Sequence, residues 1–524
     1  MDTPVAEPWT RYEDSLQWRI HHAYYQQRGA SAWLDHEIPY QSTSNIGAVQ
    51  RHVRIFAALV AERPSDDRPL WVLEVGAGSG HFAANFLKAL ARHDPKLAAR
   101  TRYVTSDYAP KSLADLARSR HLGGAIAAGQ VVPALFDINV GGSLRDPGGE
   151  PLSLPDGTQF SLVVANYVCS AIAMTPLQKE GSTWSELYVE TRERSPETRL
   201  SDDSLAALAA RPNALANLPR TNAWKPLNDD LRATFGGFHG DIIAAATANY
   251  DIATLFYPRR YFDFLRTIGP LSGDALIVTC DYGSIRSSVI RGHFGRPPQH
   301  YGNSLGQRVV FALFDPFAAA AGFEIARSSH ELDNVHIAII ARGRMAQGVR
   351  ATFDAGRLFG RNESDTISDY ANAARHFAAH DEQLAAMRCY QACVAIDPDN
   401  AQVRYDLAEL ALADQRAELA LGHLLAGQAL EPDDYDWDFM LGRAYFQCGD
   451  SRASRAAYER SLAAGPHPQT YLNLGALHRD ADRPGDALRC FRAALALDPE
   501  EARATAAIAL IEAATVIPPS APGT

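Results

Sequence analysis

The most constraining feature of the chain is a repeat of about 34 residues in its carboxyl-terminal third, beginning near Ile367. Proline recurs with this period at Pro398, Pro432, Pro466 and Pro499. Before each proline stand a small residue and then a large one, in the pairs Ala386 and Tyr390, Ala420 and Leu424, Ser454 and Tyr458, and Ala487 and Phe491. This spacing predicts pairs of helices: small residues allow close approach, large residues fill the remaining space, and proline ends the second helix.

The pattern resembles the tetratricopeptide repeat, a helix-turn-helix unit. One unit cannot bury its apolar face alone, so we expect four stacked repeats and a capping helix over residues 367–516, followed by a loose tail at 517–524. The resemblance implies an all-α solenoid whose groove takes a protein or peptide partner. Formation of a homodimer, or support of the neighbouring domain, remains an alternative role.

Charge is concentrated in the repeats. Residues 367–501 hold 22 aspartates and glutamates against 12 arginines and no lysine, whereas the whole chain carries a formal charge of -11. This excess favours a basic partner, although a solvated helix surface explains the same count. Cys389 and Cys393 are one helical turn apart at positions where the repeat packs its helices, so we expect buried thiols and no metal site.

Composition excludes several classes of protein. Hydrophobic residues make up 46% and charged residues 21%, as in ordinary globular domains. The first residues lack the pattern of a signal peptide, and no apolar run is long enough to span a membrane. Six cysteines without a C-x-x-C pair indicate a reducing compartment, so we expect a cytoplasmic protein. The acidic balance argues against nucleic acid as a general partner.

The remaining two thirds of the chain alternates strand-like and helix-like segments, which predicts a parallel sheet covered by helices. We expect strands at residues 71–75, 103–106, 131–136, 160–165 and 275–280, and a closing hairpin at 323–329 and 336–341. After the first strand comes Gly76-Ala77-Gly78-Ser79-Gly80, where a ligand can lie against bare backbone. Because His81 stands where the dinucleotide fingerprint needs glycine or alanine, nicotinamide binding is disfavoured.

Polar residues follow the strands. Asp107 and Tyr108 follow the second strand, where a carboxylate accepts ribose hydroxyls, and Asp137 follows the third, suitably placed for an adenine amino group. Capping of the next helix by Asp107, and a simple turn at Asp137, are the structural alternatives. Asn166-Tyr167 and Asp281-Tyr282 follow the next two strands.

Together, Glu74, the glycine loop, Asp107, Asp137 and the closing hairpin resemble the class I S-adenosylmethionine-dependent methyltransferases over residues 70–342. The resemblance implies a Rossmann-like α/β fold whose seven-stranded sheet has an antiparallel last strand. It implies S-adenosyl-L-methionine as cofactor, with Glu74 under its methionine part. The implied cofactor residues are Glu74, Gly76, Ala77, Gly78, Gly80, Asp107, Tyr108, Asp137 and Asn166.

A closer similarity is to MidA-like methyltransferases, which are associated with protein arginine methylation. It is carried by the segment from Asn166 to Ala171, by Trp184-Ser185-Glu186 and by Asp281-Tyr282-Gly283. In this chain Tyr167 and Ser170 stand at two positions that are acidic in that family. Since a guanidinium acceptor needs carboxylates to orient it, arginine is not implied as the substrate.

Methyl transfer mainly requires that a nucleophile be held in line with the sulfonium methyl group. Asn166, Tyr167, Asp281 and Tyr282 are the catalytic candidates, because ligands gather beyond the carboxyl ends of the strands. Either His293 or His300 is a possible base, and packing or surface roles are the alternatives for the tyrosines and histidines.

We therefore expect a helical leader at residues 1–60 that closes over the cofactor, a methyltransferase domain at 61–342 with a helical cap at about 185–260, and a linker at 343–366. Three hypotheses follow. The chain methylates a protein or peptide captured by the repeats, it methylates a small molecule and uses the repeats to dimerise, or it is a scaffold without activity.

Overall fold

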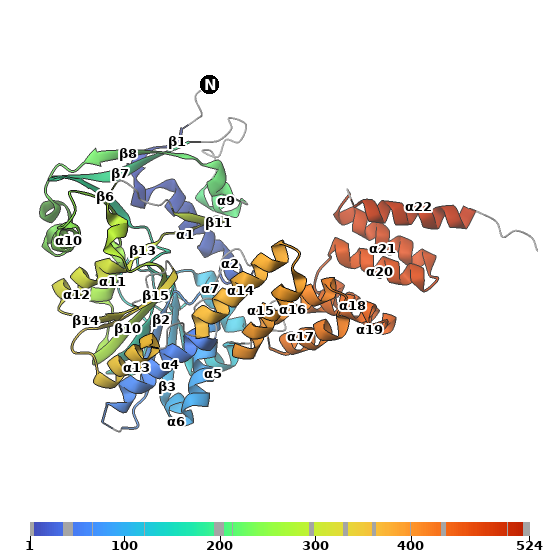
Figure 1. Cartoon of the computed structure of the whole chain (residues 1–524), viewed down its shortest axis with the longest axis horizontal. Helices are drawn as coiled ribbons and strands as arrows, with labels where there is room; N and C mark the ends of the chain where they lie inside the picture. Colours follow the sequence, from blue (N-terminus) through green and yellow to red (C-terminus); the bar gives the residue numbers. More distant parts are fainter. Residues whose placement is uncertain are drawn as a thin grey trace, which may run out of the picture. The chain divides into compact units, whose positions relative to one another are not determined.

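The computed structural model describes residues 5–34, 46–64, 66–119, 121–192, 204–211, 213–292, 298–328, 334–358, 363–398, 400–430, 436–499 and 501–516. Contacts divide the chain into two units, Met1–Asp365 and Thr366–Thr524, and each is described by itself (Figure 1). Within these described ranges, no helix has both the length and the apolar character that crossing a membrane requires.

The centre of the first unit is a sheet with the strand order β14-β15-β10-β5-β2-β3-β4. The bounds are β2 Leu70–Val75, β3 Thr101–Asp107, β4 Val131–Leu135, β5 Phe160–Val164, β10 Leu271–Ser284, β14 Glu324–Arg327 and β15 Asn334–Ala341. Neighbouring strands in the order β10-β5-β2-β3-β4 pair in parallel, whereas β15 runs antiparallel to both of its neighbours, β10 and β14. The predicted seven strands and antiparallel last strand are confirmed, and a short strand, β13 (Val309–Val310), adds to β10.

Every residue of β2 is buried, because this central strand feeds two hydrophobic cores. Leu70 and Val72 pack with α4 (Ile46–Ala61) and α5 (His81–His93) on one face of the sheet. Trp71, Leu73 and Val75 pack on the other face with α10 (Leu231–Thr247), α11 (Arg259–Thr267) and α12 (Phe314–Ala321). Alternation of side chains along one apolar strand therefore places helices on both faces.

A second, antiparallel sheet replaces the expected helical cap. Its strands are β1 (Val5–Arg11), β6 (Thr175–Glu180), β7 (Thr183–Arg192), β8 (Arg220–Pro226) and β9 (Ile252–Tyr257), and β7 pairs with β1, β6 and β8 (Figure 1). The segment 185–260, predicted to be a helical cap, thus contains most of β7 together with β8 and β9 besides the expected helices, α9 (Leu205–Ala210) and α10. The strands of this sheet carry many polar residues on the open face, so their sequence is similar to that of loops.

The leader at residues 1–60 is also not wholly helical. It begins with β1, which pairs with β7 across more than a hundred intervening residues, and continues into α1 (Leu16–Arg28), α2 (Ser31–Leu34) and α4. α1 packs against α9 and against β12 (Ser304–Gly306). The amino-terminal segment is therefore an integral part of the first unit.

Part of the segment 343–366, expected to be a linker, forms helix α13 (Gln347–Leu358) on α4. Met345, Val349 and Phe353 are buried in the same core as α4 and α5. Their spacing of one helical turn is an amphipathic signal that the surrounding glycine and arginine residues conceal. The contact boundary between the two units falls after Asp365.

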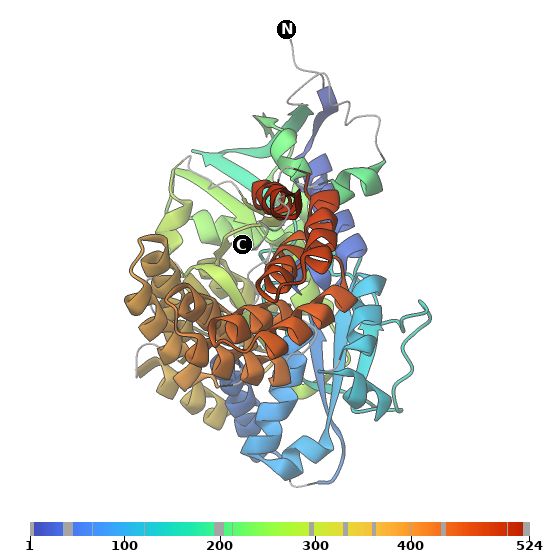
Figure 2. The ribbon, with the colours of Figure 1, turned by 90° about the vertical axis from the view of Figure 1, so that its right-hand side faces the viewer.

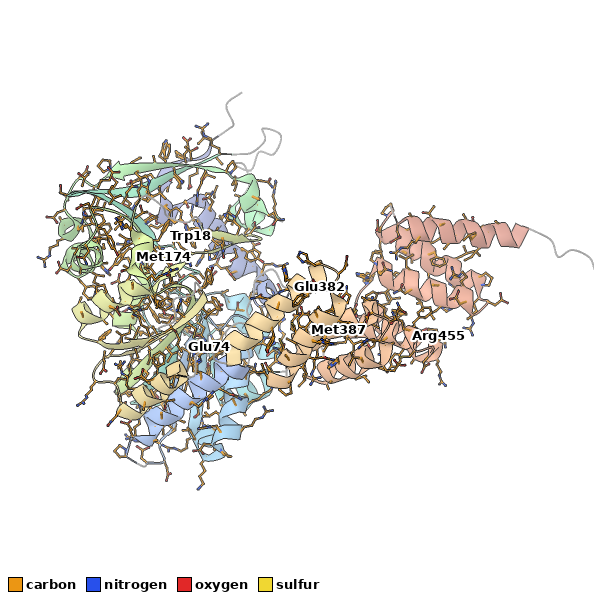
Figure 3. The ribbon with its side chains drawn as sticks, viewed as in Figure 1. Trp18, Glu74, Met174, Glu382, Met387 and Arg455 are labelled. Atoms are coloured by element: carbon orange, nitrogen blue, oxygen red, sulfur yellow. The ribbon has the colours of Figure 1, made fainter. Side chains whose placement is uncertain are left out.

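The second unit consists of helical hairpins, as predicted. The helices are α14 Glu363–Ala379, α15 Gln383–Ile396, α16 Ala401–Ala413, α17 Ala417–Leu430, α18 Trp437–Gln447, α19 Ser451–Ala464, α20 Pro468–Asp480, α21 Pro484–Leu497 and α22 Ala502–Val516. From α15 onward, each helix packs on the next one along the chain (Figure 2). Cys393 is buried between these helices. Met387 is buried there too, whereas Arg455 is more exposed (Figure 3).

Glycine sets the separation of the helices in two of these hairpins. A Cβ atom on Gly442 would lie 2.4 Å from the Tyr458 ring, and one on Gly475 would lie 2.8 Å from the Phe491 ring. Real carbon atoms do not approach so closely, so the ring occupies the space that glycine leaves. The hydroxyl of Ser454 also donates to the Gly442 carbonyl oxygen at 2.7 Å. The sequence pattern of small and large residues is therefore a packing pattern.

We expect Gly442→Ala to lower the free energy of unfolding of the repeat unit by about 1–3 kcal/mol, because the added methyl group must displace Tyr458. Gly422→Ala is the matched control, since Gly422 also lies inside a helix and has no atom near its Cβ position. That change should stabilise by about 0.5–1 kcal/mol through helix propensity. Urea unfolding of the full chain, followed by circular dichroism, measures both; equal stability of the two variants would contradict the packing argument.

Candidate functional site

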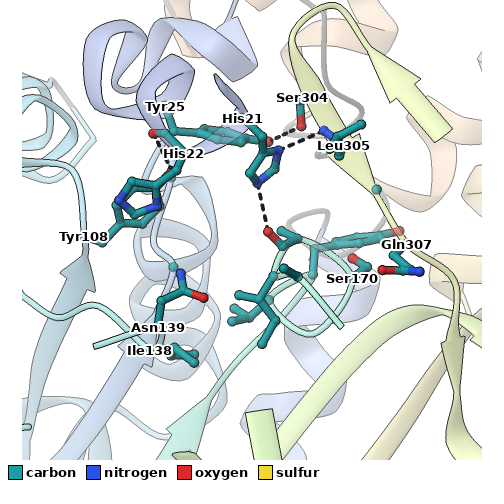
Figure 4. A pocket seen from close by; sticks show the side chains of 18 of the residues that line it. His21, His22, Tyr25, Tyr108, Ile138, Asn139, Ser170, Ser304, Leu305 and Gln307 are labelled. Atoms are coloured by element: carbon teal, nitrogen blue, oxygen red, sulfur yellow. Dashed lines mark hydrogen bonds between the residues drawn. The ribbon is translucent and has the colours of Figure 1, made fainter. Parts of the chain in front are cut away.

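A cavity of about 860 Å³ lies at the carboxyl ends of the parallel strands (Figure 4). Strand ends form one wall, while α1 and residues 304–308 form another. All predicted cofactor residues except Gly80 line it, namely Glu74, Gly76, Ala77, Gly78, Asp107, Tyr108, Asp137 and Asn166. Of the catalytic candidates, Asn166, Tyr167 and Tyr282 line it and Asp281 does not. The topology thus brings together residues that are more than two hundred positions apart.

The glycine loop is held open by backbone hydrogen bonds. The Gly76 and Ala77 amides both donate to the Ser106 carbonyl oxygen, at 2.8 and 2.9 Å, and so tie β2 to β3. Gly78 has φ +55°, a conformation that side chains disfavour. Gly80 has a packing role, because a Cβ atom there would lie 2.4 Å from Leu116 Cδ2.

Two buried carboxyl groups lie at the ends of β2 and β3. Glu74 accepts a hydrogen bond from the Tyr103 hydroxyl at 3.2 Å, and its burial raises its pKa to about 8. Asp107 accepts from the Gly78 and Ala109 amides at 3.1 and 2.9 Å, and its burial raises its pKa to about 6. Asp107 does not cap α7 (Pro110–Arg118), whose N-cap residue is Ala109. Burying a carboxylate costs free energy unless a partner compensates for the lost water. Both carboxyl groups are therefore suited to binding a cation or a group that donates hydroxyl hydrogen bonds.

At the next strand end, the leader helix meets the cavity. The His22 ring stacks on the Tyr108 ring with 4.3 Å between centroids, and the Tyr108 hydroxyl donates to the His22 carbonyl oxygen at 3.2 Å. His22 Nε2 lies 3.8 Å from an Asp137 oxygen. Burial lowers the pKa of His22, while the negative charge of Asp137 acts to raise it. α1 therefore covers the part of the cavity that Asp107 and Asp137 border, as expected of the leader.

Asn166 lines the cavity with a side-chain amide that the described residues leave unsatisfied. Both atoms of its side-chain amide are buried and, among the described residues, have no hydrogen-bond partner. A buried amide without partners costs about 1–3 kcal/mol per group, so its presence in a cavity wall indicates a ligand that satisfies it. The neighbouring Tyr167 has φ +55°, and its amide donates to the Cys280 carbonyl oxygen at 2.7 Å, which ties β5 to β10.

Asp281 and Tyr282 lie inside β10, which extends further than predicted, to Ser284. Asp281 is fully buried behind the cavity wall, where it accepts from the Ser170 and Tyr282 amides at 2.9 and 2.8 Å. Burial raises its pKa to about 7. It therefore holds the loop after β5 in place. Of the two histidines proposed as bases, His300 does not line the cavity, and His293 lies outside the described residues.

His21 was not anticipated from the sequence. Its Nδ1 accepts from the Leu305 amide at 2.8 Å, so the ring must be a neutral Nε2–H tautomer, which donates to the Ala171 carbonyl oxygen at 2.8 Å (Figure 4). Burial lowers its pKa to about 3. The ring joins α1 to two distant loops above the cavity. The Tyr25 hydroxyl makes a similar link to Ser304, at 2.8 Å.

Two other unanticipated residues are Gln307 and Arg308, which line the cavity beside Tyr282. The Gln307 amide donates to the Ser170 carbonyl oxygen at 2.8 Å, and Arg308 lies with its guanidinium 5.6 Å from the centre of the Tyr282 ring. Gln307 and Arg308 lie next to Tyr282 because Gly283 of β10 pairs in parallel with Val309 of β13. Pairing of so short a strand leaves no recognisable signal in the sequence.

Glu186, of the Trp-x-Glu element, does not line the cavity. It accepts from two nitrogens of Arg11 at 2.6 and 2.8 Å, and so joins β7 to β1. Among the described residues, no group of three or more histidine, cysteine, aspartate or glutamate side chains is arranged to hold a metal ion.

Comparison with known proteins agrees with this geometry. Residues 54–312 match the family model described as an S-adenosyl-L-methionine-dependent methyltransferase, and residues 439–466 match a tetratricopeptide repeat model. No curated protein matches the chain.

Several solved structures are similar. A Burkholderia thailandensis protein bound to S-adenosyl-homocysteine is 16% identical over 65% of this chain and 89% of its own, with a TM-score of 0.39. A native crystal structure of a member of the same superfamily from that organism is 16% identical over 65% of this chain and 88% of its own, with a TM-score of 0.40. MamA from Desulfovibrio magneticus is 15% identical over 29% of this chain and 86% of its own, with a TM-score of 0.27.

The cofactor expected from the sequence, S-adenosyl-L-methionine, is confirmed by the family match, and the cavity with its buried carboxyls fits a cationic nucleoside. Over residues 54–312 the chain is similar to a family of S-adenosyl-L-methionine-dependent methyltransferases, and it carries tetratricopeptide repeats on the carboxyl-terminal side of that match.

Proposed function

We propose that this chain methylates a protein or peptide that its repeats recruit. The observation that carries the proposal is the union, in one chain, of a methyl-donor cavity with a stack of partner-binding helical hairpins. The acidic excess of the repeats supports a partner with a basic segment. All six cysteines are in the described residues and none forms a disulfide, which supports our proposal of a reducing, cytoplasmic location.

The proposed cofactor residues are those of the strand ends. Asp107 would accept from the ribose, Asp137 would accept from the adenine amino group, and Glu74 would lie beneath the methionine part. The bare backbone of Gly76, Ala77 and Gly78 would lie along the ligand, with Tyr108 and α1 covering the nucleoside. Once bound, the cofactor supplies an electrophilic methyl group on a positively charged sulfur.

The chain's own part in the reaction is positioning. Asn166, Tyr167 and Tyr282 border the cavity where an acceptor would meet the methyl group, and they would orient it. Asp281 would act through Ser170 and Tyr282, whose amides it binds, as a positioning residue. Closure by α1 and residues 304–308 would keep bulk water from the reacting atoms.

A small-molecule acceptor is the second candidate, because the His21 bridge encloses the cavity. To separate the two, we would incubate the full chain with S-adenosylmethionine, labelled on its methyl group, and a cell extract. The extract is divided by ultrafiltration into protein and metabolite fractions. Label in the protein fraction is expected. Label confined to the metabolites would favour the second candidate.

Asp107→Asn should weaken cofactor binding about 10- to 100-fold, because charged hydrogen bonds contribute about 1.5–3 kcal/mol. Calorimetry measures the affinity directly. Asp146→Asn, in a turn outside the cavity, is the matched control and should bind as the unchanged chain does. Unaltered affinity in Asp107→Asn would exclude this aspartate from the nucleoside site.

Affinity for the cofactor should also depend on pH. Without ligand, Glu74 and Asp107 are protonated below their pKa values of about 8 and about 6 and charged above them. A cation favours the charged forms, so its binding releases protons below these values and strengthens as pH rises. We expect the affinity for S-adenosylmethionine to rise about 10-fold between pH 6 and 8.

S-adenosylhomocysteine is the internal control, since it has the same amino and carboxyl groups but a neutral sulfur. Its affinity should rise less over this range, and Glu74→Gln should reduce the difference between the two compounds. Calorimetry in buffers of different ionisation enthalpy counts the protons released. Parallel pH profiles for both compounds would show that these carboxyls do not respond to the sulfonium.

A further inference from the structure

The acceptor end of the cavity offers no suitable base among the residues that the structure describes there. Both ring nitrogens of His21 are engaged in hydrogen bonds, and His22 stacks on Tyr108 at the nucleoside end. Asp281 is behind the wall, bound to two backbone amides. Tyr167 and Tyr282 each present a phenol hydroxyl, which is a hydrogen-bond donor.

Two further carboxylates border the cavity, but arginines hold both. Glu13 lies 3.1 Å from Arg259 and 3.3 Å from Arg11, and it also accepts from the Thr175 hydroxyl at 2.5 Å. Asp14 lies 3.3 Å from Arg260. These pairs satisfy the carboxylates within the protein. Among the described residues that border the cavity, an acceptor nitrogen that must lose a proton therefore finds no partner suited to taking it.

The same end is rich in hydrogen-bond donors. Arg308 borders it with a permanent positive charge, set against the Tyr282 ring. The side-chain amide of Gln307, which is 2% exposed, interacts with the Tyr12 hydroxyl but makes no hydrogen bond of ordinary length within the described residues, and the amide atoms of Asn166 are buried there without a partner. A cation and two buried carboxamides form a site for an anion that accepts hydrogen bonds.

We propose that the acceptor is a carboxylate, held by Arg308, Gln307 and Asn166. The inference rests on the proposed methyl transfer and specifies what receives the methyl group. A carboxylate oxygen carries its lone pair without losing a proton, so its methylation needs no base.

The reaction balances without a further reactant. A carboxylate oxygen forms a bond to the methyl carbon, the carbon–sulfur bond breaks, and its electron pair stays on sulfur, so that an ester and a neutral thioether result. The negative charge of the acceptor and the positive charge of the donor cancel. The carboxylate is either a free acid or a side-chain or terminal carboxylate of a peptide.

Methyl esters are distinguished from other methylated products by alkali. The full chain is incubated with tritiated S-adenosylmethionine and the separated protein and metabolite fractions, and the products are treated with mild base. Esters release volatile methanol, whereas methyl groups on nitrogen remain attached. Volatile label released from the protein fraction supports both the carboxylate acceptor and the protein or peptide substrate. Volatile label released from the metabolite fraction alone supports a carboxylate acceptor but overturns the protein or peptide substrate. Stable label overturns the carboxylate alone, and absence of label overturns both.

Variants of the anion site give an independent check. Gln307→Glu is isosteric and adds a negative charge, so it should lower methylation of a carboxylate about 10- to 100-fold. A cationic acceptor would instead be methylated as well or better. Arg308→Met should also lose activity about 10- to 100-fold, with partial recovery in Arg308→Lys. The matched control is Arg232→Met, an exposed arginine paired with Asp241 within α10.

Calorimetry with S-adenosylhomocysteine accompanies each variant, because it reports a folded cofactor site independently of turnover. Affinity within about two-fold of the unchanged chain, together with lost transfer, supports the assignment. Transfer at the original rate in Gln307→Glu or Arg308→Met overturns it. If Arg308→Met fails to bind the thioether, the smaller change in Gln307→Glu decides the question.

Discussion

Parallel pairing of β2 with β3 on one side and β5 on the other is the constraint on which the site depends. The register places Glu74 opposite Thr105 and Val164, so the three strands end at one edge of the sheet. Two amides of the glycine loop then share the Ser106 carbonyl oxygen, and Asp107 binds the Gly78 amide in return. Because these bonds lie within the protein, the loop is preorganised before a ligand arrives.

The cavity has two ends of different electrostatic character. Glu74, Asp107 and Asp137 border one end, and burial there raises the pKa of Glu74 and Asp107. Arg308 and two carboxamides border the other. A cation brought to the first end relieves the penalty of burying carboxylates, and an anion at the second satisfies donors. This polarity is the physical basis of our proposals for cofactor affinity and for the acceptor.

The amino-terminal segment completes the cavity through contacts that span long stretches of chain. His21 bonds to Ala171 and Leu305, which are 150 and 284 residues away. The ring does so only while neutral, and its burial holds the pKa at about 3. Nothing in the local pattern around His21 indicates this role, because its partners are backbone groups of two distant loops. Gln307 and Arg308 were missed for the same reason.

The sequence by itself determined the repeats, the order and type of the central strands, the glycine loop and the acidic residues at the carboxyl ends of β2, β3 and β4. These features depend on local periodicity and on residues adjacent to each strand end, which a linear pattern records. Tertiary structure decided that the cap is a sheet and that α13 belongs to the first unit. It also placed Asp281 behind the wall of the cavity, whereas Asn166 is part of that wall. Such outcomes depend on burial and on hydrogen bonds between distant segments, and neither is encoded in the spacing of neighbouring residues.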